Sequence, residues 1–199
     1  MKYSFACKLY GFFYHQSCKK ILAEKCGRGI CQEVRTEYQV IVLRAKEIGN
    51  SRLLSAYMMA AYFIALNRSN KLSAQENYEL FRDGLYANKL FHMALGNGDS
   101  YLDRRKFAKR KEWERKSHER KYGNDWVVDV LDQTESYDLG YNYYECGICK
   151  LCRDEGCFEL ARYLCRLDFV LADIMGMRLE RSMTLAEGGA YCDFRYSRK

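Results

Sequence analysis

The spacing of apolar residues changes once along this 199-residue chain, at Asn124. Before that residue, apolar side chains recur every three or four positions, which is the period of one face of an α-helix. After it, short β-branched and aromatic runs alternate with polar residues, as in a β-strand. A helical part followed by strand, strand, helix, strand and strand predicts an α+β fold with a four-stranded antiparallel sheet. We expect a single domain over 1–199, with a helical half over 1–123 and a sheet-containing half over 124–199.

Glycine and polar residues have to end the predicted helices of the first half, because the chain contains no proline. Ser73, followed by Gln75 and Glu76, has the pattern of a helix N-cap. The longest apolar run is shorter than the roughly 18 residues that a membrane crossing needs, so we interpret it as a buried core helix. The helices predicted in this half are 5–25, 30–48, 53–66, 73–95 and 100–121, the third of which is that run.

The sheet-containing half has two pairs of strand patterns on either side of one long amphipathic helix. This helix is predicted over 158–175, with leucines on one side and Gly176 at its end. The strands are predicted from alternating or β-branched runs. They are 126–131, 139–144, 178–186 and 191–196. We expect the helical half to pack on this sheet.

Ten cysteines do not indicate a disulfide framework here, because the chain is not short and we see no secretory signal. We expect a reducing, cytoplasmic location. The formal charge of +7 raises the question of nucleic acid, but much of the excess lies in 101–121. Acidic residues such as Glu112 are interleaved there with basic residues such as Lys116 at helical spacing. This pattern favours a solvated helix over a nucleic-acid or membrane partner, and a homo-oligomer is left open.

Four cysteines follow one another closely at the start of the second half. Cys146, Cys149, Cys152 and Cys157 have the spacing C-x2-C-x2-C-x4-C, which is close to an iron-sulfur pattern but not the same. A zinc site would normally need a second cysteine pair farther along the chain. Free cysteine is also often buried as a small hydrophobe, so packing, catalysis by one thiol and metal binding all stay open. The chain has no GxGxxG, Walker, GxSxG or HExxH motif, and we assign it no cofactor and no metal ligand.

Several short motifs recur in a defined order after Asn124. They are Asn124-Asp125-Trp126, Tyr144-Glu145-Cys146-Gly147, Glu159-Leu160 leading to Cys165-x-x-Asp168, Arg181-x-x-Thr184, and Gly188-Gly189-x-x-Cys192-Asp193-Phe194-Arg195. In this order and spacing they resemble the L-2-amino-thiazoline-4-carboxylic acid hydrolase family, over about the last 75 residues. The resemblance implies a hydrolase that opens a small cyclic amidine or thiazoline carboxylic acid at a carbon-nitrogen bond.

The reaction that the family name implies adds water to the carbon between the ring nitrogen and the sulfur of the substrate. Such a site needs a nucleophile or activated water, an acid or base for the proton transfers, and a cation that holds the substrate carboxylate. The chain offers all three residue types. The candidate catalytic residues are Cys146, Glu145, Cys165, Asp168 and Cys192, and the candidate substrate-binding residues are Arg181, Thr184, Asp193 and Arg195.

Each of these assignments has a structural alternative. In the structural alternative, Arg181 forms a buried ion pair with Asp168 and does not bind substrate. Cys192 and Asp193 then only begin a strand after the glycine turn. For the protein as a whole, the alternatives are a small-ligand-binding or sensor domain without catalysis, and a cysteine-ligated zinc or iron-sulfur protein. An enzyme requires the candidate side chains to converge on one pocket.

Overall fold

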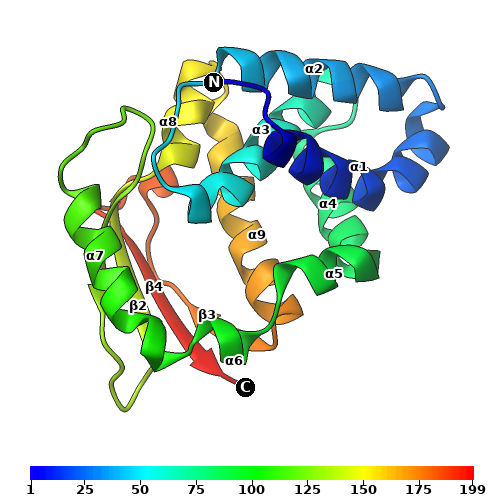
Figure 1. Ribbon diagram of the computed structural model, residues 1–199. Helices are drawn as coiled ribbons and strands as arrows, with labels where there is room; N and C mark the ends of the chain where they lie inside the picture. Colours follow the sequence, from blue (N-terminus) through cyan, green and yellow to red (C-terminus); the bar gives the residue numbers. More distant parts are fainter.

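A four-stranded antiparallel sheet lies against a layer of helices in the computed structural model, which describes residues 1–199 (Figure 1). The strands are β1 (Val127–Leu131), β2 (Leu139–Glu145), β3 (Met177–Glu180) and β4 (Cys192–Arg198), and they lie in the order β1-β2-β4-β3. No strand occurs in the helical half. The α+β fold that the sequence predicts, with its antiparallel sheet, is therefore confirmed.

Nine α-helices and four short 3-10 turns make up the rest of the chain. The helical half contains α1 (Phe5–Cys26), α2 (Ile30–Arg44), α3 (Leu54–Ser69), α4 (Ala74–Ala87), α5 (Lys89–Leu95), α6 (Gly98–Tyr101) and α7 (Phe107–Ser117). The sheet-containing half contains α8 (Gly147–Asp154) and α9 (Ala161–Ile174). The 3-10 turns are η1 (Ser51–Leu53), η2 (Arg104–Lys106), η3 (Phe158–Leu160) and η4 (Leu185–Glu187).

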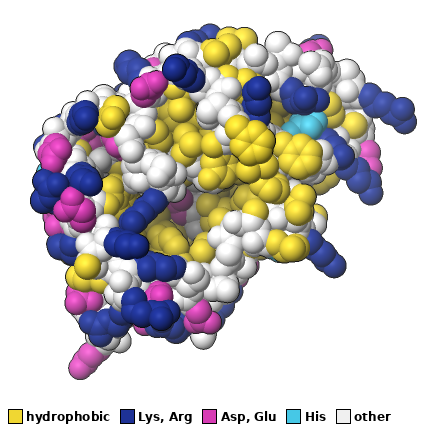
Figure 2. All heavy atoms as spheres, in the orientation of Figure 1, with side chains coloured by type: hydrophobic (Ala, Val, Ile, Leu, Met, Phe, Trp, Pro, Cys, Tyr) yellow, Lys and Arg dark blue, Asp and Glu magenta, His cyan; other side chains and the backbone are white.

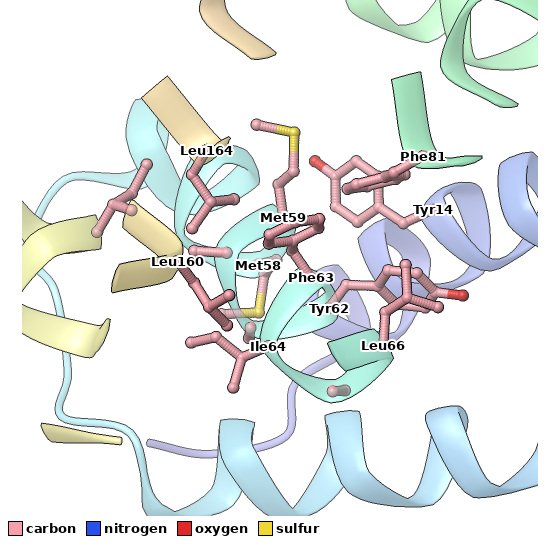
Figure 3. Close-up of a cluster of buried hydrophobic side chains, with 14 of the residues drawn as sticks. Tyr14, Met58, Met59, Tyr62, Phe63, Ile64, Leu66, Phe81, Leu160 and Leu164 are labelled. Atoms are coloured by element: carbon pink, nitrogen blue, oxygen red, sulfur yellow. The ribbon is translucent and has the colours of Figure 1, made fainter. Parts of the chain in front are cut away.

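Helix α3 is the centre of the main core. Every residue from Tyr57 to Leu66 is buried, and the surrounding side chains come from α1, α4 and α9, as Figure 3 shows for Tyr14, Phe81 and Leu164. A helix that is apolar on all sides has to be enclosed by others. The predicted core helix is thus confirmed, and none of the helices is both long and apolar enough to span a membrane.

Two of the predicted helices are broken in the structure by asparagine or aspartate caps. The predicted helix 73–95 begins as expected, with a capping box between Ser73 and Glu76, but it divides at Asn88. The Asn88 side chain accepts a hydrogen bond from the backbone N–H of Phe91 and so begins α5. A side chain that binds a backbone N–H in this way competes with a continuous helix.

The predicted helix 100–121 is interrupted in the same way. Its first turn belongs to α6, and α7 does not begin until Phe107. In between, the Asp103 carboxylate accepts a hydrogen bond from the backbone N–H of Arg105 and starts a 3-10 turn. The expected pairing of Glu112 with Lys116 along α7 is present, at 3.3 Å. The predicted helix 30–48 ends early, at Arg44.

The predicted strand 178–186 is too long, because β3 ends at Glu180. The Asp193 carboxylate accepts hydrogen bonds from the backbone N–H groups of Ser182 and Met183, at 3.0 and 2.8 Å. These bonds hold the backbone in a turn rather than in a sheet ladder. The segment with the clustered cysteines, for which the sequence predicts no element, forms α8 and packs against α3.

One face of the sheet is covered by helices and the other carries polar side chains. Along β4, the buried residues Cys192, Phe194 and Tyr196 alternate with Asp193 and Arg195 on the opposite face. Helix α7 packs against β1 and α9 packs against β3, so the two helices lie over opposite edges of the sheet. A cavity lies over the central strands β2 and β4, and residues of the helical layer form its opposite wall.

Candidate active site

A cavity of about 210 Å³ lies over the middle of the sheet, between β2, β4, α9 and the helical layer. Its wall is mostly apolar and aromatic, and Figure 2 shows the hollowed surface above it with apolar side chains on the inside. Four side chains in the wall carry a thiol or a carboxyl group, which can act as a nucleophile or in proton transfer. They are Cys146, Cys165, Asp168 and Cys192. The cavity is smaller than typical ligand-binding pockets, which are about 300–1,000 Å³, so only a small molecule fits it.

Register and helical spacing bring these four residues together. Cys192 pairs with Tyr143 across β2 and β4, so both side chains lie on the covered face of the sheet. Cys146 follows directly after β2, at the N-cap of α8. Cys165 and Asp168 are three residues apart on α9 and therefore share one face of that helix. Of the nine candidate site residues, these four therefore line one cavity.

Gly147 allows the start of α8 to approach the rest of the site. A Cβ at this position would lie 2.4 Å from the backbone oxygen of Asn124 and 2.7 Å from the ring of Trp126. No side chain can be accommodated at that distance without moving α8. The glycine therefore places Cys146 at the cavity wall, and the Asn124-Asp125-Trp126 segment supports it from behind.

Cys146 is the thiol with the strongest support for its ionised form. The neighbouring Cys149 thiol and the backbone N–H groups of Ile148 and Cys149 stabilise the thiolate and lower the pKa of Cys146, against the effect of burial and of Asp168. Backbone N–H groups at the start of a helix favour negative charge in this way. The pKa of Cys149 is raised, because it donates to Cys146 and is itself buried.

The other two thiols of the cavity are held in the neutral form. Burial raises the pKa of Cys165, and the carboxylate of Asp168 raises it further. Burial also raises the pKa of Cys192 to about 11, although the backbone N–H of Leu185 donates to its sulfur at 3.2 Å. Since the thiolate is the nucleophilic form, the geometry favours Cys146 among the three candidates.

Asp168 forms a buried ion pair with Arg181, as the structural alternative for these two residues predicted. The Nη1 atom of Arg181 donates to the Asp168 carboxylate at 2.7 Å, and its Nη2 donates to the backbone oxygen of Cys165 at 2.9 Å. The guanidinium lies between the rings of Phe169 and Phe194, 4.9 Å from each centroid. Arg181 is only 5% exposed and lies behind the cavity wall, whereas Asp168 lines the cavity. Arg181 therefore orients Asp168.

The carboxyl of Asp168 titrates close to neutral pH. Burial raises its pKa to about 6, and Arg181 opposes this rise only in part. The side chain keeps 24% of its surface, which faces the cavity. A carboxyl group with this pKa can donate a proton at mildly acidic pH and accept one at neutral pH.

This pKa leads to a prediction for stability. The folded protein holds the Asp168 proton more tightly than the unfolded chain, so the contribution of this group to stability is favourable at low pH. It is lost as the pH rises from about 4 to about 6. Between pH of about 4 and 7, the unfolding free energy of the wild type relative to Asp168→Asn should fall by about 3 kcal/mol, measured by urea denaturation.

Asp173, on the same helix, is the matched control. Lys199 and Tyr86 bind its carboxylate and lower its pKa, so its contribution to stability is present at neutral pH and lost in acid. The unfolding free energy of the wild type relative to Asp173→Asn should therefore rise with pH, opposite to the result for Asp168→Asn. Equal slopes for the two variants would contradict the raised pKa of Asp168.

The remaining site candidates lie outside the cavity. Glu145 accepts hydrogen bonds from Arg120 at 2.7 Å and Lys150 at 2.6 Å, which outweigh the effect of burial and lower its pKa. Arg195 is on the polar face of the sheet and donates to the backbone of Tyr141 at 3.1 Å. Strand alternation sends it there, because its neighbour Phe194 points into the core.

Asp193 and Thr184 have structural partners in the turn after β3. The Asp193 carboxylate accepts hydrogen bonds from the backbone N–H and the hydroxyl of Ser182, at 3.0 and 2.7 Å. Burial raises the pKa of Asp193, but these hydrogen bonds outweigh burial and lower the pKa. Thr184 is buried and donates to the Glu187 carboxylate at 2.8 Å. The alternation of buried and exposed residues after the double glycine is the sequence signal that separates Cys192 from Asp193 and Arg195.

The clustered cysteines beyond Cys146 are packing residues. Cys149, Cys152 and Cys157 are buried in the main core, and all ten cysteines of the chain are free thiols. No three His, Cys, Asp or Glu side chains gather closely enough to hold a metal ion. The geometry thus gives the metal-protein alternative no ligand set.

Reasoning from motifs missed the part of the wall that comes from the helical half. Tyr14 of α1, Arg52 and Leu53 of η1, and Phe91 of α5 line the same cavity as Cys146. Tyr14, Leu53 and Phe91 equally suit the core, and Arg52 belongs to none of the motifs, so nothing in the sequence indicated this part of the wall. Only the packing of the helical layer on the sheet shows that they border a cavity.

The sequence was compared with models of known protein families and with known proteins. A sequence model described as L-2-amino-thiazoline-4-carboxylic acid hydrolase matches residues 51–196, which is longer than the resemblance expected from the motifs alone. The match includes every residue that lines the cavity except Tyr14. No curated protein and no solved structure matches the chain. With most of its length covered by one family model, the chain belongs to the L-2-amino-thiazoline-4-carboxylic acid hydrolase family.

Proposed function

We propose that this protein is a hydrolase that opens a small cyclic amidine carboxylic acid, such as a 2-amino-thiazoline-4-carboxylate, at the ring carbon-nitrogen bond. The observation that carries the proposal is the pair of Cys146 and Asp168 in the wall of one small cavity. Among the three thiols of the cavity, Cys146 is the one whose pKa is lowered, and Asp168 is the cavity carboxyl whose pKa is raised to about 6. The family match supports a hydrolase, and the bond and the substrate are our inference.

The amidine carbon is electrophilic, so the Cys146 thiolate can add to it and form a tetrahedral intermediate. Protonated Asp168 then gives its proton to the ring nitrogen, and the carbon-nitrogen bond breaks. The ring nitrogen becomes a free amine, while the carbon stays attached to both the substrate sulfur and Cys146.

The Asp168 carboxylate formed in this step can take a proton from a water molecule that attacks the same carbon. The collapse of the second intermediate expels the Cys146 thiolate and leaves a carbamoyl group on the substrate sulfur. The sum is substrate plus one water, with both groups returned to their starting protonation states. Arg181 keeps Asp168 pointed at the cavity throughout, because both of its bonds to α9 are fixed by packing.

Incubation of the purified protein with L-2-amino-thiazoline-4-carboxylate tests the proposal. We expect a product heavier by one water, with a new primary amine and no new free thiol, as measured by mass spectrometry and by amine and thiol reagents. Release of a free thiol would show cleavage at the carbon-sulfur bond and contradict the bond assignment. Binding without any turnover at neutral and alkaline pH would contradict the enzyme proposal and favour the ligand-binding alternative.

A further inference from the structure

Neither arginine that the sequence suggested as a carboxylate ligand is available inside the cavity, and Arg52 is the only basic side chain of its wall. Arg181, which the sequence suggested for this role, is committed to Asp168 and to the backbone of α9. Arg195 is on the opposite face of the sheet. The remaining wall is largely apolar, and a carboxylate buried there without a partner would cost several kcal/mol. An acidic ligand must therefore leave its carboxylate at the opening of the cavity.

A second hollow, of about 430 Å³, adjoins the cavity and has a strongly basic lining. The two share Arg52, Leu53, Tyr101 and Tyr143, which places the junction between them at these residues. We call this hollow the basic mouth. Its charged side chains are Arg52, Lys106, Lys109 and Arg110, and no carboxylate lines it. Figure 2 shows Lys and Arg side chains gathered beside the hollowed part of the surface.

Two of these four cations are already used by the fold. Arg110 is buried and donates to the backbone oxygens of Tyr101 and Asp103. Lys106 donates to the backbone and the hydroxyl of Ser100, the latter at 2.8 Å. Their charges contribute to the field of the mouth, but these bonds to the backbone fix the direction of both side chains.

Arg52 and Lys109 are different, because neither side chain makes a hydrogen bond or an ion pair with the protein. Arg52 is the residue at the junction: it lines the cavity, the basic mouth and a further hollow along α7. Its backbone is fixed, since the N–H of Arg52 donates to the Asn50 side chain at 2.9 Å and starts η1. A guanidinium held at this point presents a planar pair of donors, which suits a carboxylate.

We propose that Arg52, assisted by Lys109, binds the carboxylate of the substrate at the basic mouth, so that the amidine carbon enters the cavity first and faces Cys146. This assignment rests on the proposed function for the identity of the ligand, a small cyclic amidine carboxylic acid. It places substrate recognition on the helical half, in η1 and α7, and the chemistry on β2, α8 and α9.

Alkylation of Cys146 tests the assignment without requiring turnover. Iodoacetate carries a carboxylate and iodoacetamide is its neutral counterpart, and both react with a thiolate. The rate of each is measured on the Cys146 peptide by mass spectrometry. Arg52→Gln should lower the ratio of the iodoacetate rate to the iodoacetamide rate by about tenfold, because the favourable field at the mouth is weakened. Added salt should lower the ratio in the wild type more than in the variant.

The neutral reagent controls for folding and for the thiol itself, since its rate should be unchanged in Arg52→Gln. Arg28→Gln is the matched charge control, because Arg28 is exposed in the loop between α1 and α2 and lines none of these hollows. Lys109→Gln should give a smaller decrease than Arg52→Gln. An unchanged ratio in Arg52→Gln, or a Cys146 that neither reagent reaches, would overturn the assignment.

Turnover separates this proposal from the proposed function. If the protein opens the amidine acid, Arg52→Gln should raise KM about tenfold for the acid and leave the KM for the corresponding carboxamide unchanged. An equal increase for both would overturn the role of Arg52 while the hydrolase assignment stands. If the wild type opens neither compound but the alkylation ratio falls as expected, the proposed function fails and Arg52 stands as the recognition residue for a small carboxylate.

Discussion

Replacing Arg181 with methionine should lower the unfolding free energy at neutral pH by about 3–5 kcal/mol, because a buried carboxylate is left without its partner. Arg181 is 5% exposed and donates to Asp168 at 2.7 Å. The variant also loses the contacts of the guanidinium with the rings of Phe169 and Phe194. Chemical denaturation measures the effect, and it should be smaller near pH of about 5, where Asp168 holds a proton.

Two further variants separate the ion pair from other effects of the substitution. Arg178→Met, in β3 three residues before Arg181, removes an exposed arginine and should change stability by less than about 0.5 kcal/mol. The double variant Arg181→Met with Asp168→Asn should recover part of the loss, since no buried charge remains. A loss that is the same at both pH values and is not recovered by the second substitution would refute the role of the ion pair.

Replacing Cys146 with serine should decrease kcat/KM for ring opening by about a hundredfold or more, because a serine hydroxyl is far less ionised than this thiol. The Cys149 thiol and the first backbone N–H groups of α8 stabilise a thiolate at Cys146 and lower its pKa. Cys165→Ser and Cys192→Ser should have much smaller effects, since burial keeps both thiols neutral. Steady-state kinetics with each variant measures the difference.

Cys152→Ser is the matched control for the chemistry of the substitution. Cys152 is fully buried in the core and does not line the cavity, so its loss should affect stability rather than turnover. Circular dichroism and a denaturation curve for each variant report the fold. Full activity in Cys146→Ser, or loss of activity only in Cys165→Ser or Cys192→Ser, would show that the nucleophile has been assigned to the wrong thiol.

The expectations for helices failed where short polar side chains bind the backbone. The helices predicted over 73–95 and 100–121 run without a break through Asn88 and Asp103. In the folded chain, each of these side chains accepts a backbone N–H and starts a new element. The free energies of the two arrangements differ by about 1 kcal/mol, so long-range packing decides between them.

The sequence by itself determined the fold class, and it named the thiols and the carboxyl that line the cavity of the candidate site. The change of period at Asn124 separates the helices from the sheet, and the alternation along β4 decides which residues face the cavity, because both depend on local geometry. Only the tertiary structure decided the rest. Whether Arg181 pairs with Asp168 or stays free, and where Arg52 lies relative to the cavity, depend on contacts between separate segments. Such contacts carry no local period, since they form only when the helical layer closes over the sheet.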